Sequence, residues 1–192
     1  MARSARLGLA RVLPAATLAI VALAAACTDP VRDQAIEQLG PEAPGVPPGP
    51  EHRPGQPCLL CHAEGGPASD APFAVAGTVY ENESPNSPGA ADVEVRFVDA
   101  ANGAPRVPVF TNRSGNFFVR QAEWADLTYP FKVGLFRDDV SVQTMATTVN
   151  REGSCNHCHR KNPPEPLTDL DVELARRSYG QIYVTAGTGG AP

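Results

Sequence analysis

The chain has 192 residues, with 16 Lys and Arg against 21 Asp and Glu, and it contains five Cys. This length allows one domain of ordinary size with extensions, but not two full domains. The acidic balance speaks against nucleic acid and anionic lipid surfaces as partners, because both carry negative charge.

The first 26 residues are typical of a signal peptide that is removed on export. Three arginines within residues 3–11 precede an uncharged apolar run over residues 13–26, which is too short to span a bilayer comfortably and ends in small residues. A buried core helix is the alternative, but a position at the amino terminus favours export. Removal of these three arginines leaves 13 Lys and Arg against 21 Asp and Glu, so the exported chain is more acidic.

The residue after this segment is Cys27. The sequence Leu23-Ala24-Ala25-Ala26-Cys27 resembles the signal of bacterial lipoproteins, although the Leu lies one position further from the Cys than usual. The resemblance implies a lipid on Cys27 that anchors the protein to a membrane, in the periplasm or at the outer membrane. Ordinary cleavage at the same site is the alternative, and it would leave Cys27 as the free amino terminus of a secreted protein.

Residues 27–57 are predicted to be a spacer. Pro and Gly dominate from residue 40 to residue 57, which favours an extended chain with little core to bury. A short helix is predicted within the spacer, over Pro30–Leu39. Residues 58–72 then carry the first of two cysteine motifs.

From residue 73 to residue 149 apolar and polar residues alternate, as is typical of strands. Six short strands are predicted, over residues 73–79, 93–97, 107–111, 116–120, 131–135 and 140–146. In the first strand, Phe73, Val75, Gly77 and Val79 share one face. The third and fourth strands flank the turn Asn112–Gly115, which predicts a hairpin. The pattern predicts a mainly β fold, a small antiparallel β-sandwich.

The last segment, residues 150–192, carries the second motif and a tail. A short helix is predicted to begin near Thr168 and to end near Gly180, and residues 181–186 are predicted to form a last strand.

The strand region resembles the carboxypeptidase-regulatory-like domains, whose fold is a transthyretin-like, Ig-like sandwich. The resemblance rests on residues 77–80, 91–95 and 111–117, and it covers about residues 74–120. Such domains are mostly structural or adhesive modules. The resemblance therefore implies a scaffold here and not an active site.

Two motifs of the form Cys-x-x-Cys-His flank this region. Cys58, Cys61 and His62 form the first, and Cys155, Cys158 and His159 form the second. Two thiols at this spacing reach the two vinyl groups of one haem, and the following His then lies under the iron as its proximal ligand. The pattern is that of c-type cytochromes, and it predicts two covalently attached haems, with His62 and His159 bound to iron.

Other interpretations of the motifs remain open. Each Cys pair forms a disulfide in one of them, with the following His incidental. In another, all four Cys meet at one structural zinc. A thioredoxin-like reductase is disfavoured, because no βαβ pattern surrounds either motif.

The sixth ligands of the two irons come from a short list: His52, His157 and Met145. All four His of the chain lie in or beside the motifs, and none falls in the strand region. Met145 lies ten residues before Cys155 on an otherwise polar strand face, where it is either an iron ligand or a surface residue covered by the tail. His157 cannot easily reach the iron of its own motif, so it ligates another haem or is exposed.

The predicted function follows from these motifs. Six alternating strands return the chain to the end at which it began, so both motifs are predicted at the same pole of the sandwich. The chain is predicted to be a membrane-tethered dihaem electron carrier, whose partner is a redox protein that is basic if charge steers the encounter. A cell-surface structural or binding module, held by disulfides or by a zinc with four Cys ligands, is the alternative. No cluster of side chains indicates a catalytic distal pocket.

Overall fold

The computed structural model describes residues 29–42, 44–161 and 178–185. The signal segment, Cys27 and the helix expected after Thr168 lie outside these residues. The chain divides into two compact units, Met1–Gly40 and Pro41–Pro192. The first unit contains one described helix, and the second contains all the strands.

Helix α2 spans Pro30–Gln38 and confirms the helix predicted in the spacer. Its start is specified locally, because the Asp29 carboxylate accepts a hydrogen bond of 3.0 Å from the Arg32 N–H and Pro30 occupies the first turn. Gly40, with φ of 69°, follows the helix in the left-handed conformation that ends many helices. Among the helices of the described residues, none is long and apolar enough to cross a membrane.

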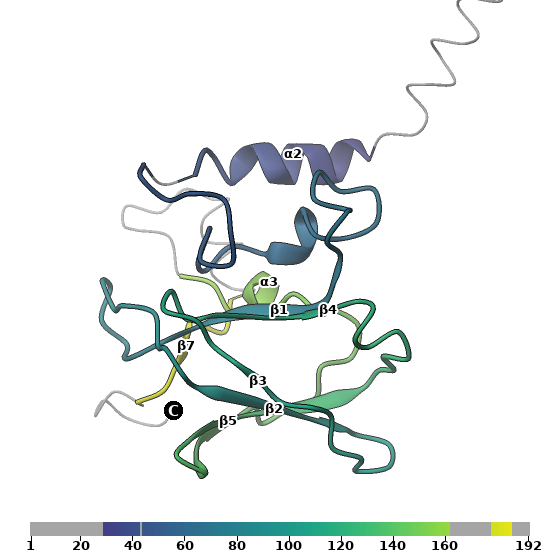
Figure 1. Cartoon of the computed structure of the whole chain (residues 1–192), viewed down its shortest axis with the longest axis vertical. Coiled ribbons are helices and arrows are strands. Elements are labelled where there is room, and N and C mark those ends of the chain that lie inside the picture. Colours follow the sequence, from purple (N-terminus) through teal and green to yellow (C-terminus); the bar gives the residue numbers. More distant parts are fainter. Residues whose placement is uncertain (1–28, 43, 162–177, 186–192) are drawn as a thin grey trace, which may run out of the picture. The chain divides into compact units, whose positions relative to one another are not determined.

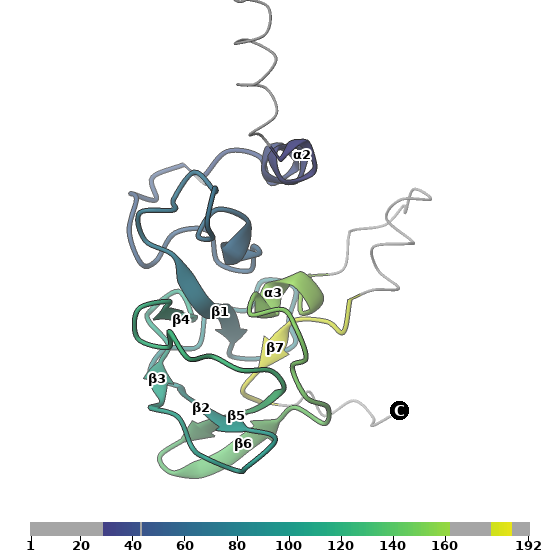
Figure 2. The same ribbon diagram turned by 90° about the vertical axis from the view of Figure 1, so that its right-hand side faces the viewer.

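The second unit is mainly β, and its described strands form two sheets, in the orders β4-β1-β7 and β3-β2-β5-β6 (Figures 1 and 2). The strands are β1 Phe73–Tyr80, β2 Glu94–Asp99, β3 Val109–Phe110, β4 Asn116–Arg120, β5 Phe131–Arg137, β6 Val140–Thr144 and β7 Ile182–Tyr183. All neighbours pair antiparallel except β1 and β7, which are parallel. The arrangement is consistent with a small β-sandwich, and a strand overlaps each segment where one was predicted.

The two sheets share one apolar core. Val75 and Val79 of β1 are fully buried, and Phe97 of β2 lies at the centre of a group of aromatic rings. The ring of Phe97 meets that of Trp124 edge to face at 4.8 Å, and it also contacts Phe131 at 6.1 Å. Alternating apolar residues on both sheets therefore provide the burial that holds this unit together.

The first strand departs from its predicted alternation. The register of β1 against β4 shifts between Phe73 and Val75, which marks a β-bulge. Phe73 consequently leaves the inner face of Val75, and its ring stacks on that of Phe118 at 4.8 Å. The prediction that Phe73 shares the face of Val75 is wrong, because a bulge inserts one residue and changes the direction of the side chains beyond it.

The predicted hairpin around Asn112–Gly115 is wrong in its pairing. The turn itself exists, since the Asn112 side chain accepts hydrogen bonds from the N–H groups of Ser114 and Asn116, both at 3.0 Å. The strands on either side, however, belong to different sheets: β3 pairs with β2, and β4 pairs with β1. Strand β3 is also shorter than predicted, because Pro108 has no N–H to donate to a neighbouring strand.

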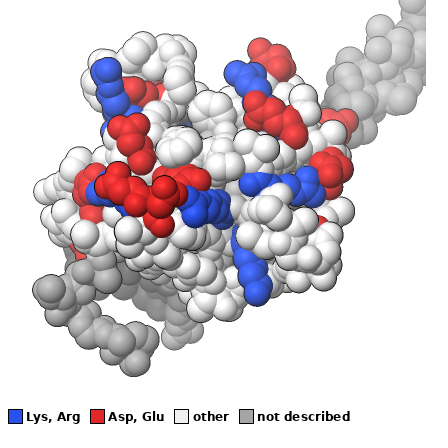
Figure 3. Space-filling model, turned by 60° about the horizontal axis from the view of Figure 1, so that its bottom comes forward, with Lys and Arg blue, Asp and Glu red and all other residues white. Residues whose placement is uncertain are grey.

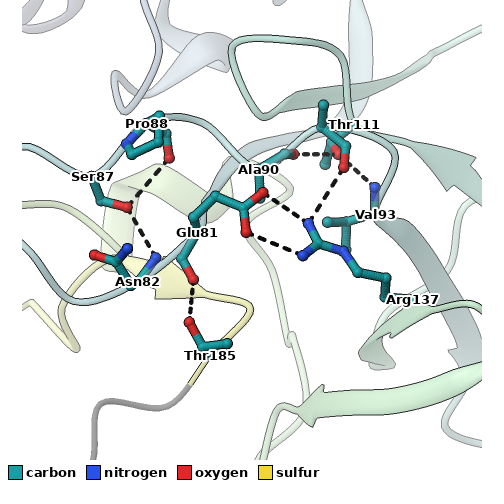
Figure 4. Close-up of polar contacts among 10 residues, drawn as sticks. Glu81, Asn82, Ser87, Pro88, Ala90, Val93, Thr111, Arg137 and Thr185 are labelled. Carbon is teal, nitrogen blue, oxygen red and sulfur yellow. Dashed lines mark hydrogen bonds and ion pairs between the residues drawn. The ribbon is translucent and has the colours of Figure 1, made fainter.

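Polar contacts also connect the two sheets. Arg137, the last residue of β5, forms a two-pronged ion pair with Glu81, the residue that follows β1, through contacts of 3.1 and 2.9 Å (Figure 4). Both side chains are about one-third exposed, so solvent screens the pair and its contribution to stability is modest. The buried Thr111 hydroxyl, close by, donates to the carbonyl of Ala90 and accepts from the N–H of Val93.

Charge on the surface is mixed. On the face drawn in Figure 3, acidic and basic side chains lie next to one another instead of forming a surface of one sign. Arg96 pairs with both Glu94 and Asp139, for example. The negative net charge of the chain is therefore partly compensated at close range on this face.

Candidate functional site

Both Cys motifs form the same kind of tight turn. In the first, a 3₁₀ turn over Cys58–Leu60, the carbonyl of Cys58 accepts a hydrogen bond of 2.9 Å from the N–H of His62. In the second, the short helix α3 over Cys155–Cys158, the carbonyl of Cys155 accepts one of 2.8 Å from the N–H of His159. Residues three apart are neighbours on such a turn, so each Cys pair is presented on one side. All four thiols are free.

Each motif histidine is oriented by a backbone carbonyl. The Nδ1 atom of His62 lies 2.8 Å from the oxygen of Ala71, and the Nδ1 atom of His159 lies 3.1 Å from the oxygen of Gly180. A carbonyl oxygen can only accept, so Nδ1 carries the proton in both rings. The Nε2 lone pair of each ring is then available to a metal, in the arrangement that metal-binding histidines commonly show.

The first motif lies beside an aromatic stack that the bulge in β1 creates. The ring of His62 stacks on that of Phe73 at 4.1 Å, with an angle of 13° between the planes. The ring of His52 lies nearly parallel to that of His62 at 5.8 Å. Two axial ligands of one iron point at each other end on, whereas these two imidazoles lie face to face. His52 would therefore have to move in order to act as the sixth ligand beside His62.

The second motif borders a cavity of about 550 Å³. This volume lies within the range of roughly 300–1,000 Å³ that is usual for cofactor and small-molecule sites. Its wall includes Cys155, Cys158 and His159, and also Met145, which follows the end of β6. Tyr179 from the tail lines it too. The structure thus brings the predicted ligand Met145 to the same cavity as the second motif, and this set of donors and the size of the cavity fit a haem.

No protein family, curated protein or solved structure matches this chain.

The two motifs are brought together against β1. Ala76 of β1 forms a β-bridge with Ser154, the residue before Cys155, and both the 3₁₀ turn Cys58–Leu60 and α3 contact β1. A Cβ added to Gly77 of β1 would lie only 2.8 Å from the Cβ of Cys155, so glycine is required there for the second motif to pack so closely.

The spacer predicted over residues 27–57 is in part bound to the sheet. The N–H of Gly55 donates to the hydroxyl of Thr78 at 2.8 Å, and the side-chain amide of Asn116 donates to the carbonyl of His52 at 3.0 Å. Residues 52–55 therefore belong to the compact second unit, because buried polar groups of β1 and β4 need partners and find them in this segment.

The remaining predicted ligand, His157, is exposed, with its N–H donating to the carbonyl of Ser154. Within the described residues, no group of three or more His, Cys, Asp and Glu side chains is arranged to hold a metal ion. Sequence reasoning missed Asn156 and Thr78, which are buried beside the motifs. A polar residue between the two Cys of a motif is a weak signal, and nothing in the sequence near Thr78 indicates its partners.

Burial keeps two of the motif thiols protonated. Burial raises the pKa of Cys58 from its ordinary value of 9.0 to about 11, and burial together with the nearby Cys58 raises the pKa of Cys155 to about 12. Because the thiolate is the reactive form, both thiols are poor nucleophiles in the folded chain at neutral pH.

The raised thiol pKa values predict that Cys58 and Cys155 are alkylated slowly in the folded, haem-free protein. A Cys58 pKa of about 11 in place of 9.0 lowers the thiolate fraction roughly 100-fold at pH 8, so iodoacetamide should modify Cys58 about 100-fold more slowly in the folded than in the unfolded protein. The unfolded chain releases these protons above pH 9 while the folded chain keeps them, so the haem-free protein should also lose stability as pH rises through this range. Peptide mass spectrometry in buffer and in urea measures the two rates, and equal rates would show that these thiols are not buried.

Proposed function

We propose that this chain is an exported, membrane-tethered dihaem c-type cytochrome that transfers electrons. The observation that carries the proposal is the pair of Cys-x-x-Cys-His turns, in each of which a backbone carbonyl accepts the Nδ1 proton of the His and leaves Nε2 free. In this proposal Cys58, Cys61, Cys155 and Cys158 hold the two haems as thioethers, and bound haem iron supplies one-electron chemistry.

The environment of the second motif supports a haem held by two side chains there. His159 and Met145 line the same cavity, and the Nε2 atom of His159 and the thioether sulfur of Met145 would hold its iron. Met145 also leaves the sheet where its N–H donates to the carbonyl of Val133, which fixes the backbone at the cavity wall. A Met ligand would raise the reduction potential above that of a site with two His ligands.

The β-sheets are proposed to act as a scaffold, in line with the resemblance to transthyretin-like modules. Residues 1–26 would direct export, and a lipid on Cys27 would hold the protein at a membrane facing the periplasm or the outside of the cell. The electron partner would be another redox protein. Acidic and basic side chains are mixed on the face in Figure 3. This mixture supports recognition of the redox partner by local charge pairs better than attraction of the partner by net charge alone.

The experiment is expression of the full chain together with the bacterial haem-attachment machinery. A pyridine haemochrome assay is expected to find two covalent haems per chain, and intact-mass analysis is expected to show the same addition. The same mass spectrum reports acyl groups on Cys27. A colourless protein would overturn the proposal: bound zinc would then favour the four-Cys metal site, and a loss of two hydrogens per Cys pair would favour disulfides.

A further inference from the structure

Two residues, Asn156 and His157, lie between the cysteines of the second motif, and haem attachment does not explain why the first of them is buried. Asn156 is 1% exposed, whereas its neighbour His157 points to solvent. The spacing of a Cys-x-x-Cys-His motif needs only two residues at these positions, of any kind. A buried amide here must therefore be accounted for by its contacts.

The Asn156 side chain bridges strand β1 and the segment before the first motif. Its oxygen accepts from the N–H of Thr78 at 3.1 Å, and its amide nitrogen donates to the Thr78 hydroxyl at 3.0 Å. The same nitrogen donates to the carbonyl of Gln56 at 2.9 Å. Three hydrogen bonds, two of them buried and one partly buried, leave this amide little freedom to move.

The far end of this bridge reaches the first motif directly. Gln56, whose carbonyl accepts from Asn156, lies two residues before Cys58 in the chain, so this connection remains when the thiol becomes a thioether; in the haem-free chain the same carbonyl also accepts from the Cys58 thiol at 3.4 Å. The two motif segments also approach each other at Gly153, two residues before Cys155. A Cβ added to Gly153 would lie 3.3 Å from a methyl carbon of Leu59 in the first motif. One carbonyl group thus connects the inside of the second motif to the first Cys of the first motif.

We infer that Asn156 is a positioning residue, whose amide holds the two Cys motifs at a fixed separation on β1 so that their haems form one coupled pair. This inference rests on the proposed function. The magnetic interaction of two paramagnetic irons falls steeply as the distance between them grows, so a shift of one motif relative to the other is measurable at the haems.

The test compares the fully oxidised, matured protein with two variants that each lose one buried polar side chain. Asn156→Leu removes all three bridging hydrogen bonds and keeps the branching and the number of heavy atoms of the side chain. Thr111→Val is the matched control, because Thr111 is 3% exposed and makes two hydrogen bonds in the other part of the sheet structure, to Ala90 and Val93. Electron paramagnetic resonance measures the magnetic interaction of the two irons, and the haemochrome assay counts the haems.

The wild-type protein is expected to show interacting irons, Asn156→Leu to lose or weaken that interaction while keeping two haems, and Thr111→Val to leave it unchanged. Asn156→Ser serves if the Leu variant does not fold: its hydroxyl still reaches β1 but is too short for Gln56, so a weakened interaction is expected again. Two haems without magnetic interaction in the wild type would overturn this inference but not the proposed function. Equal changes of the interaction in the Asn156 and Thr111 variants, or no change in either Asn156 variant, would also overturn it. Absence of haem would overturn the proposed function instead.

Discussion

Replacing both Cys155 and Cys158 with alanine is expected to lower the covalent haem content of the matured protein from two per chain to one. Each haem needs the two thiols of its own turn, and the turn of Cys58 and Cys61 is intact in this variant. The haemochrome assay measures the loss directly. Because the cavity beside His159 and Met145 would lose its covalent anchor, the spectrum of the remaining haem should be that of the first motif alone.

The matched variant replaces Cys58 and Cys61 and is also expected to retain one haem. The two single-haem proteins should differ in their spectra and in their reduction potentials, because only the second motif borders Met145. A Cys155 and Cys158 variant that still carried two haems would contradict the assignment of these thiols. Identical spectra of the two variants would contradict the participation of Met145.

Phe97→Ala is expected to be the most damaging single substitution in the core. Its ring is 1% exposed and contacts those of Phe117, Trp124 and Phe131, so truncation leaves a cavity lined by aromatic rings. Removal of such a ring typically costs about 3–5 kcal/mol of unfolding free energy. Urea denaturation followed by circular dichroism at a fixed state of haem loading measures the loss.

The control for this substitution is Phe110→Ala. Phe110 is an aromatic strand residue of the same sheet but is 62% exposed, so its truncation should change the unfolding free energy by no more than about 0.5 kcal/mol. A similar loss for both variants would contradict the placement of the core between the two sheets.

The mainly β fold follows from local patterns in the sequence. Alternation of apolar residues predicted Val75 and Val79 as inward-facing, and the structure confirms both as buried. The same alternation failed at Phe73, because one extra residue in a strand reverses the direction of its side chains and leaves no trace in composition. The turn at Asn112 showed where the chain bends, but turn residues do not determine whether the flanking strands pair with each other.

Some features of the candidate site could be predicted from local sequence, and others are visible only in the folded chain. The spacing of Cys and His is local and is visible without a structure, whereas the partners of the histidines are carbonyls, which every residue has. Asn156 and its hydrogen-bond partner Thr78 are separated by 78 positions in the chain, so no local sequence pattern could have predicted their contact. The candidate Met145 could be named from its residue type alone, and only the folded chain shows that it shares a cavity with the second motif.

The short length of β3 limits the pairing of further chains with this border of the sheet. Strands β3 and β6 form the two borders of the larger sheet, and β3 has only Val109 and Phe110 in regular pairing, directly after Pro108. An open border with a long row of unsatisfied amides is a template on which further chains polymerise into fibrils. Two residues beside a proline provide too few attachment points for such growth, which protects this border of the sheet, where the Phe110 side chain of β3 is exposed.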